Sequence, residues 1–210
     1  MTLDRPLVLA TKNRGKISEF QGLFRDSDIE IKTLDDFGPI PPVIEDGDTF
    51  EDNAVKKAQF TARVLGIPAI GDDSGLTVKA LQGAPGVFSS RFAGENADDD
   101  ANNRKLLAEM EGVEDRAAAF VCVLAIAVPR GPALIYEGTC EGMIAETPKG
   151  DQGFGYDPLF YYPPLQKTFA QLGREEKNSI SHRGKASEEL RGELDRVIIW
   201  LKQRLSEEPF

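Results

Sequence analysis

The chain has 210 residues, 40% of them hydrophobic, and a formal net charge of −10 with a single histidine. This length is sufficient for one well-buried core. The acidic excess argues against a general duplex-binding surface, which needs an extended positive face. We therefore expect one domain over residues 1–210 and no nucleic-acid partner.

The sequence also predicts where the protein works. Its longest apolar run, residues 117–128, is too short to span a membrane, and its N-terminus lacks a basic segment followed by a long apolar one. Cys122 and Cys140 lie in apolar or β-branched stretches without a CxxC pattern or a nearby histidine, so we expect reduced core residues. The expectation is a soluble, cytoplasmic protein with no membrane partner.

Short apolar runs alternate with helical patterns in the first quarter of the chain. Strands are predicted at residues 7–10 and 29–32, and a proline-rich loop at 38–43 interrupts regular structure. The helix predicted between the two strands has its apolar positions at Ile17, Phe20, Leu23 and Phe24.

A second helix is predicted over residues 50–65. Thr49 has the character of its N-cap, with Asp52 in the first turn, and Gly66 and Pro68 end it. Residues 68–71 are predicted to form a short strand that leads into an acidic turn, GDDSG, at residues 71–75.

The second half predicts a further helix at residues 96–110 and a long strand, buried on both faces, at 117–128. Residues 133–146 alternate enough to be the hairpin partner of that strand, and a last helix is predicted at 185–205. Helices mixed with long hairpin strands indicate an α/β fold in which helices flank a mixed, twisted central sheet.

The stretch ATKNRGK, residues 10–16, is a candidate phosphate-binding turn. It fails the Walker pattern, because Ala10 and Ile17 replace the required glycine and hydroxyl residue, and it lacks the three glycines of a dinucleotide fingerprint. Thr11, Asn13 and Lys16 would nevertheless face an anion at the start of a helix. The alternative is that Asn13 only caps the helix and Lys16 is solvated.

Adjacent carboxylates at Asp72 and Asp73, directly after a buried strand, need a compensating cation, donor or solvent. Hard oxygen ligands favour magnesium, which keeps waters and bridges carboxylates to substrate phosphates. Glu45 is a candidate second ligand, and Asp46, Asp48 and Glu51 are its competitors for that position. The alternative to a metal site is a solvated acidic turn.

Two later stretches have the chemistry of a base site. In GDQGFGYDPLF, residues 150–160, glycines beside Phe154 and Tyr156 allow a flat ring to stack, and Asp157 could accept from ring nitrogens. A glycine-rich hairpin with two core aromatics is the alternative. In residues 174–186, cations cluster around the only histidine, which is either structural or a donor to base carbonyls. The cluster contains Lys177, His182, Arg183 and Lys185.

These motifs, taken together, resemble the noncanonical purine nucleoside triphosphate pyrophosphatases, the inosine/xanthosine triphosphatase family. The similar segments are ATKNRGK, IEDGDTFEDNA, DDSGLTVKALQGAPGVFSSRFAG, FGYDP and EEKNSISHRGKA, in family order from Val8 to Ala186. The resemblance implies two lobes with a substrate cleft between them, a homodimer, a Mg²⁺ cofactor and a nucleotide substrate. It implies hydrolysis of ITP, dITP and XTP to monophosphate and pyrophosphate, which cleanses the nucleotide pool.

The resemblance also implies residue roles. Asp73 would be the catalytic acidic residue that orders water and magnesium, with Glu45 as the other metal-side carboxylate. The remaining residues would bind substrate: Thr11, Asn13, Lys16, Lys177 and Ser74 at the phosphates, and Phe154, Gly155, Tyr156, Asp157, His182 and Arg183 at the base. A nucleotide sensor without catalysis, and a phosphohydrolase acting on other nucleotides, are the alternative functions.

Overall fold

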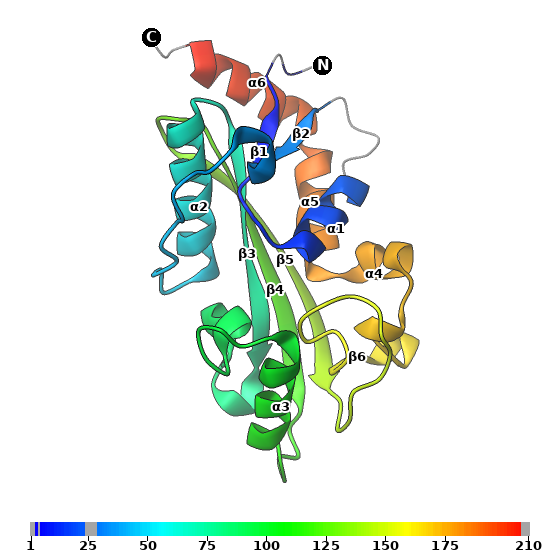
Figure 1. The fold of residues 1–210 in the computed structure, drawn as a ribbon. Helices are drawn as coiled ribbons and strands as arrows, with labels where there is room; N and C mark the ends of the chain where they lie inside the picture. Colours follow the sequence, from blue (N-terminus) through cyan, green and yellow to red (C-terminus); the bar gives the residue numbers. More distant parts are fainter. Residues whose placement is uncertain (1–2, 4, 24–28, 207–210) are drawn as a thin grey trace. The chain divides into compact units, whose positions relative to one another are not determined.

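The computed structural model describes residues 3, 5–23 and 29–206 (Figure 1). Within these residues, seven strands form one open sheet, in which β4 is central. Their order in the sheet is β2 (Ile31–Thr33), β1 (Leu7–Leu9), β3 (Ala69–Val78), β4 (Ala117–Ala127), β5 (Ala133–Ile144), β6 (Phe160–Tyr162) and β7 (Lys167–Thr168). The strands β1 and β2, and β1 and β3, pair in parallel, whereas β5, β6 and β7 pair antiparallel. The predicted mixed sheet with flanking helices is therefore confirmed.

The chain divides into two compact units, which are described separately. Unit 1 comprises the residues up to Asp73, Val123–Glu137 and the chain from Ala186; unit 2 comprises Ser74–Cys122 and Gly138–Lys185. Three strands and one helix contain residues of both units: β3 (Ala69–Val78), β4 (Ala117–Ala127), β5 (Ala133–Ile144) and α5 (His182–Gly192).

Unit 1 contains the parallel strands and the helices beside them. Its elements are β1 (Leu7–Leu9), α1 (Arg14–Leu23), β2 (Ile31–Thr33), α2 (Phe50–Leu65) and α6 (Leu194–Ser206). The first strand and helix confirm the prediction, β2 begins two residues later than expected, and Phe24 lies outside the described residues. Within this unit α2 lies on one side of β3 and β4, and α1 and α5 lie on the other (Figure 1).

The helix α2 packs closely on the sheet because its buried face is built from alanines. Ala54, Ala58 and Ala62 are all fully buried in one cluster with residues of β1, β3 and β4. Its ends are those predicted: the Thr49 side chain accepts from the Asp52 N–H, and Gly66 adopts the left-handed conformation that closes the helix.

Unit 2 has its own core, built around the residues of β3, β4 and β5 that belong to this unit. Its elements are α3 (Asp99–Glu109), β6 (Phe160–Tyr162), β7 (Lys167–Thr168) and α4 (Arg174–Ile180). Phe120, Phe160 and Phe169 pack with ring centroids 4.5–5.7 Å apart in this core. The two cysteines are buried, as predicted, and neither is in a disulfide.

Two predicted elements were wrong in extent. Residues 68–75 do not form a short strand and a turn, because β3 continues without interruption to Val78. The single helix predicted at 185–205 is two helices, α5 and α6, separated at Glu193 directly after Gly192. By contrast β4 and β5 are sheet neighbours joined by residues 128–132, too short a link for a parallel crossover, so the predicted hairpin is confirmed.

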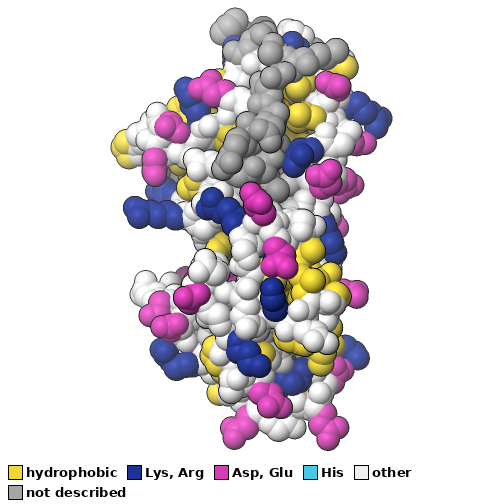
Figure 2. All heavy atoms as spheres, turned by 90° about the vertical axis from the view of Figure 1, so that its right-hand side faces the viewer, with side chains coloured by type: hydrophobic (Ala, Val, Ile, Leu, Met, Phe, Trp, Pro, Cys, Tyr) yellow, Lys and Arg dark blue, Asp and Glu magenta, His cyan; other side chains and the backbone are white. Residues whose placement is uncertain are grey.

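The surface carries charges of both signs. On the face shown in Figure 2, Lys and Arg side chains are interspersed with Asp and Glu side chains, with smaller apolar areas between them. Among the described residues, no helix is both long and apolar enough to cross a membrane.

Candidate active site

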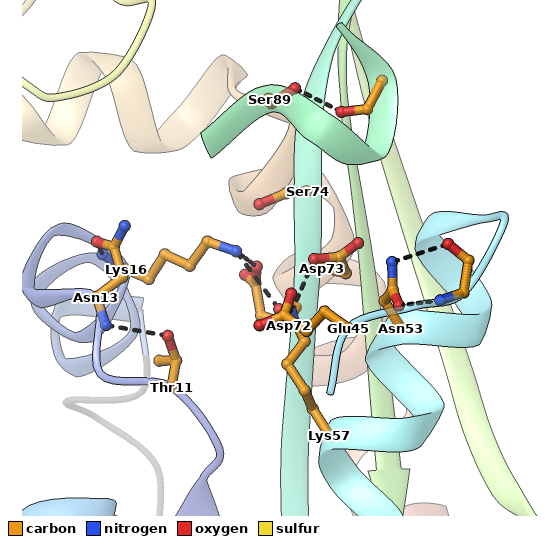
Figure 3. Close-up of polar contacts among 12 residues, drawn as sticks. Thr11, Asn13, Lys16, Glu45, Asn53, Lys57, Asp72, Asp73, Ser74 and Ser89 are labelled. Carbon is orange, nitrogen blue, oxygen red and sulfur yellow. Dashed lines mark hydrogen bonds and ion pairs between the residues drawn. The ribbon is translucent and has the colours of Figure 1, made fainter. Parts of the chain in front are cut away.

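Strand β3 carries both adjacent carboxylates, and its alternation sends them to opposite faces of the sheet. Asp72 is directed to the side of α1 and Asp73 to the side of α2 (Figure 3). The acidic turn was wrongly predicted because aspartates and glycines are poor strand formers. Here each carboxylate meets a lysine from the helix on its own face, which compensates the charge within the strand.

Lys16 is the cation on the α1 side. Its Nζ donates to the side chain of Asp72 and, at 3.4 Å, to the Asp72 carbonyl oxygen, while the lysine side chain is only 13% exposed. Asn13 caps α1, because its Oδ1 accepts from the Lys16 N–H at 3.1 Å, and the Asn13 N–H in turn donates to Thr11 Oγ1 at 3.2 Å. Asn13 therefore caps α1, whereas Lys16 is largely buried and is not a solvated surface lysine.

Lys57 is the cation on the α2 side, and the sequence reasoning missed it. Its Nζ donates to Asp73 Oδ1 at 2.7 Å and to Glu45 Oε2 at 3.0 Å (Figure 3). Two carboxylates far apart in the sequence therefore converge on one ammonium group. A signal was present: Lys57 immediately precedes Ala58 in the buried alanine face of α2, where a lysine requires a partner.

The surroundings of Asp73 and Lys57 shift the pKa values of both side chains. Burial raises the pKa of the Asp73 carboxyl above its ordinary value, and the ammonium groups of Lys57 and Lys16 oppose that rise without cancelling it. Burial acts to lower the pKa of Lys57, but the carboxylates of Asp73 and Glu45 outweigh it and raise that pKa. A buried carboxylate beside a cation is typical of a site that handles protons or metal ions.

The acidic loop before α2 is anchored to the helix that carries Lys57, and it presents Glu45 to the same ammonium group as Asp73. Asn53, fully buried on α2, accepts from the Gly47 N–H at 2.8 Å and donates to the Gly47 carbonyl at 3.4 Å. Asp46 instead pairs with Lys56 at 2.7 Å near the surface.

The residues around Lys57 fit a magnesium ion that retains much of its water. Asp73 Oδ2 is buried and has no hydrogen-bond partner among the described residues, and Glu45 lies across the same ammonium group. Within the described part of the chain there is no cluster of three or more Asp, Glu, His or Cys residues able to hold a metal. Two carboxylates, with waters and phosphate oxygens completing the shell, is the donor set that magnesium commonly takes.

Unit 2 holds the predicted base-side residues around the loop 153–157. Asp157 Oδ2 accepts from the Phe154 N–H at 2.9 Å and from Lys177 Nζ at 2.6 Å. That ammonium group also lies 4.9 Å from the centroid of the Phe154 ring. A Cβ on Gly153 would meet Asp157 Oδ2 at 2.0 Å, so this fold of the loop requires glycine there. Lys177, which the resemblance assigns to the phosphates, lies here beside Asp157 and Phe154, among the predicted base-side residues.

The two aromatic residues of the loop differ in role. Tyr156 belongs to the unit 2 core, where its hydroxyl donates to the Ser89 carbonyl at 2.8 Å and burial raises its pKa. Phe154 is only half-buried, so its ring is the one with a face available for stacking. Of the two aromatic residues that the alternative placed in the core, only Tyr156 is a core residue.

His182 and Arg183 begin α5, three residues before the predicted start of that helix. The His182 ring stacks on Phe120, with centroids 4.7 Å apart and planes 15° apart. Arg183 is 1% exposed, and its Nη2 donates to Ser74 Oγ at 2.7 Å. Ser74, which the resemblance assigns to the phosphates, therefore lies beside Arg183 in unit 2.

The predicted site residues thus form two groups. In unit 1, Thr11, Asn13 and Lys16 lie at the start of α1, and Glu45 and Asp73 meet at Lys57. The unit 2 group consists of Ser74, Phe154, Gly155, Tyr156, Asp157, Lys177, His182 and Arg183.

Comparison with known proteins gives a consistent result. The model of the Ham1 family matches residues 7–193. The dITP/XTP pyrophosphatases of Syntrophobacter fumaroxidans and Desulfotalea psychrophila are each 58% identical over 202 residues, covering 96% of this chain and 87% and 91% of the relatives. The structure of a HAM1 protein from Coxiella burnetii is 46% identical and superposes with a TM-score of 0.85, covering 93% of this chain and all of that one.

Proposed function

The chain belongs to the Ham1 family, and on this premise we propose that it hydrolyses dITP, XTP and ITP to the nucleoside monophosphate and pyrophosphate. Relatives named dITP/XTP pyrophosphatase, 58% identical over nearly the whole chain, support this substrate class. The activity would remove deaminated purine nucleotides from the pool before a polymerase incorporates them.

One observation carries the catalytic part of the proposal. Asp73 and Glu45 converge on Lys57 Nζ at 2.7 and 3.0 Å, and Asp73 keeps a second, buried oxygen without a hydrogen-bond partner among the described residues. A nucleotide sensor would have no use for a buried acceptor beside a paired carboxylate. A hydrolase needs such an acceptor to orient the attacking water.

Asp73 and Glu45 are the residues that would hold magnesium. The bound ion would neutralise charge on the phosphates and on the departing pyrophosphate. The protein's own cations would add to this: Lys16 lies in the first turn of α1, and a helix N-terminus also attracts phosphate oxygens.

The proposed reaction forms a bond between a water oxygen and the α-phosphorus and breaks the bond from that phosphorus to the bridging oxygen. Asp73 would orient the water through Oδ2 and accept its proton, and pyrophosphate would leave with the bridging oxygen. Lys57 would keep Asp73 in place by holding its other oxygen.

The base-side residues would provide the selectivity. Hypoxanthine and xanthine present a carbonyl oxygen at position 6, where adenine presents an amino group. Donors from Lys177, His182 and Arg183 would form hydrogen bonds to this carbonyl. With adenine, the same donors would face the amino group, which is itself a donor, and no hydrogen bond would form. Phe154 would stack on the ring.

Release of pyrophosphate from a panel of ITP, XTP, dITP, GTP, ATP and CTP, with and without magnesium, tests the proposal. We expect magnesium-dependent release from the first three and at least tenfold slower release from the others. Comparable rates on CTP would favour a phosphohydrolase of other specificity. Binding of ITP without any release would favour a sensor.

Three further properties belong to the proposal. We propose a single functional domain over residues 1–210, a homodimer in solution and a cytoplasmic location, as the family resemblance implies. Size-exclusion chromatography with light scattering would decide the oligomeric state, because a dimer has twice the 23.0 kDa mass of the chain.

A further inference from the structure

Helix α3 contacts the base-side loop at a residue that has no side chain of its own. Asp99 Oδ2 accepts from the Gly155 N–H at 2.6 Å, and Asn103 Nδ2 donates to the Gly155 carbonyl at 2.9 Å. Asp99 and Asn103 are four residues apart, so they lie on the same face of the helix. One glycine is therefore bound through both of its backbone polar groups.

This double contact restricts the most flexible residue of the loop. The Gly155 N–H belongs to the peptide shared with Phe154, and its carbonyl belongs to the peptide shared with Tyr156. Fixing both peptides fixes the backbone angles between them, and Gly155 has a φ of +62°, a conformation that glycine adopts readily but need not keep. Loss of the contact would leave the Gly155–Tyr156 peptide, and with it the part of the loop next to Phe154, less restrained.

The other supports of the loop do not replace this contact. Asp157 ties the Phe154 N–H to Lys177, and the Tyr156 hydroxyl is bound to Ser89. The turn itself holds one of the two peptides next to Gly155, because the Asp157 N–H donates to the Phe154 carbonyl at 3.3 Å. None of these three contacts engages the Gly155 carbonyl, which accepts from Asn103. From α3, Asn103 therefore holds the Gly155–Tyr156 peptide, and Asp99 adds a second hydrogen bond to the Phe154–Gly155 peptide.

We propose that Asp99 and Asn103 are positioning residues that fix the Phe154–Asp157 backbone for recognition of the purine base. Asp99 and Asn103 would contact neither the base nor the phosphates and would act only through Gly155. The proposal rests on the proposed function, because it assumes that Phe154 and Asp157 bind the base of the substrate.

Neighbours in α3 provide matched controls. Asn102 is also buried, but its side chain accepts from the Ala93 N–H at 2.8 Å and donates to the Ser90 carbonyl at 3.2 Å, away from the loop. Asp100 is exposed in the same first turn as Asp99. Asn102→Ala therefore removes an equally buried amide, and Asp100→Ala an equally acidic side chain.

The test compares Asn103→Ala and Asp99→Ala with these controls in full-length protein. We expect each of the two variants to raise the KM for dITP about tenfold, the cost of one well-placed hydrogen bond, and to reduce the preference for dITP over dATP. Inhibition by inorganic tripolyphosphate, which has no base, is expected to be unchanged. Asp99→Asn keeps an acceptor oxygen and is expected to restore the KM.

The outcomes distinguish a failure of the proposed function from a failure of the positioning role. If the unmodified protein does not hydrolyse dITP, the proposed function fails. If it does, but Asn103→Ala behaves like Asn102→Ala, or weakens tripolyphosphate and dITP equally, the positioning role is wrong.

Discussion

Asp72 and Asp73 are consecutive residues of one strand, yet their carboxylates are paired with lysines of two different helices. Asp72 contacts Lys16 of α1, whereas Asp73 contacts Lys57 of α2. The period of two in a strand produces this division without any loop. Each lysine offsets a charge that would otherwise be too costly to bury, so the strand can carry both carboxylates in a fixed geometry.

Asp73→Asn is expected to lower kcat for dITP by a factor of roughly 10²–10⁴, the usual contribution of a proton acceptor, while nucleotide binding stays measurable. Steady-state kinetics and calorimetric titration with dIMP would provide both values. Asp46→Asn is the control, since Asp46 pairs with Lys56 near the surface and should be almost silent. Full activity of the Asp73→Asn variant would contradict the catalytic role of Asp73.

Asn53→Ala is expected to raise the magnesium concentration needed for half-maximal activity by about tenfold or more, because outer-shell partners of metal ligands commonly contribute that much. The variant frees Gly47 and with it the loop that presents Glu45. Gln59→Ala, which removes an amide on the same helix that contacts Gly131, should leave the magnesium requirement unchanged. Equal magnesium curves for both variants would contradict the anchoring role.

Gly71→Ala is expected to destabilise the protein by about 1–3 kcal/mol, the usual cost of overpacking. An added Cβ would lie 2.1 Å from the Ala54 carbonyl oxygen, so either β3 or α2 would have to shift. Urea unfolding would measure the change. Gly192→Ala is the matched control: its Cβ would meet nothing within 4 Å, and its stability should be equal or slightly higher.

Tyr136→Phe is expected to weaken the loss of stability in strongly alkaline solution. Burial, with a smaller effect of Glu193, raises the pKa of Tyr136 to about 12. A pKa higher in the folded than in the unfolded state gives a contribution that is complete below about pH 10 and lost as pH rises through 12. Urea unfolding at pH 9, 10 and 11 should show a shallower decline for the variant than for Tyr161→Phe; equal slopes would contradict the prediction.

The parts of the fold that could be predicted from the sequence are those governed by local rules. The N-cap at Thr49, the closing glycine of α2 and the apolar run of β4 each carry their signal within a few residues. The hairpin of β4 and β5 follows from two such runs and a short link. These elements agree with the structure to within one or two residues.

The parts that failed depend on partners distant in the sequence. The continuation of β3 through Asp72 and Asp73 is stabilised by Lys16 and Lys57, and no local pattern identifies these pairings. The alanine pattern of α2 indicates that Lys57 needs a partner, but it does not identify Asp73 or Glu45 as that partner. Similarly, the contact of α3 with Gly155 joins residues more than 50 positions apart, and only the fold brings them together.

The alanine face of α2 has a consequence for how the unit 1 site tolerates change. Asn53 and Lys57 are one helical turn apart, and Ala54 and Ala58 beside them hold that helix close to the sheet. The metal-side loop and the ion pair of Asp73 therefore share one support. A larger side chain in this face would displace both at once. Substitutions at these alanines, although far from any substrate atom, should therefore lower the turnover rate.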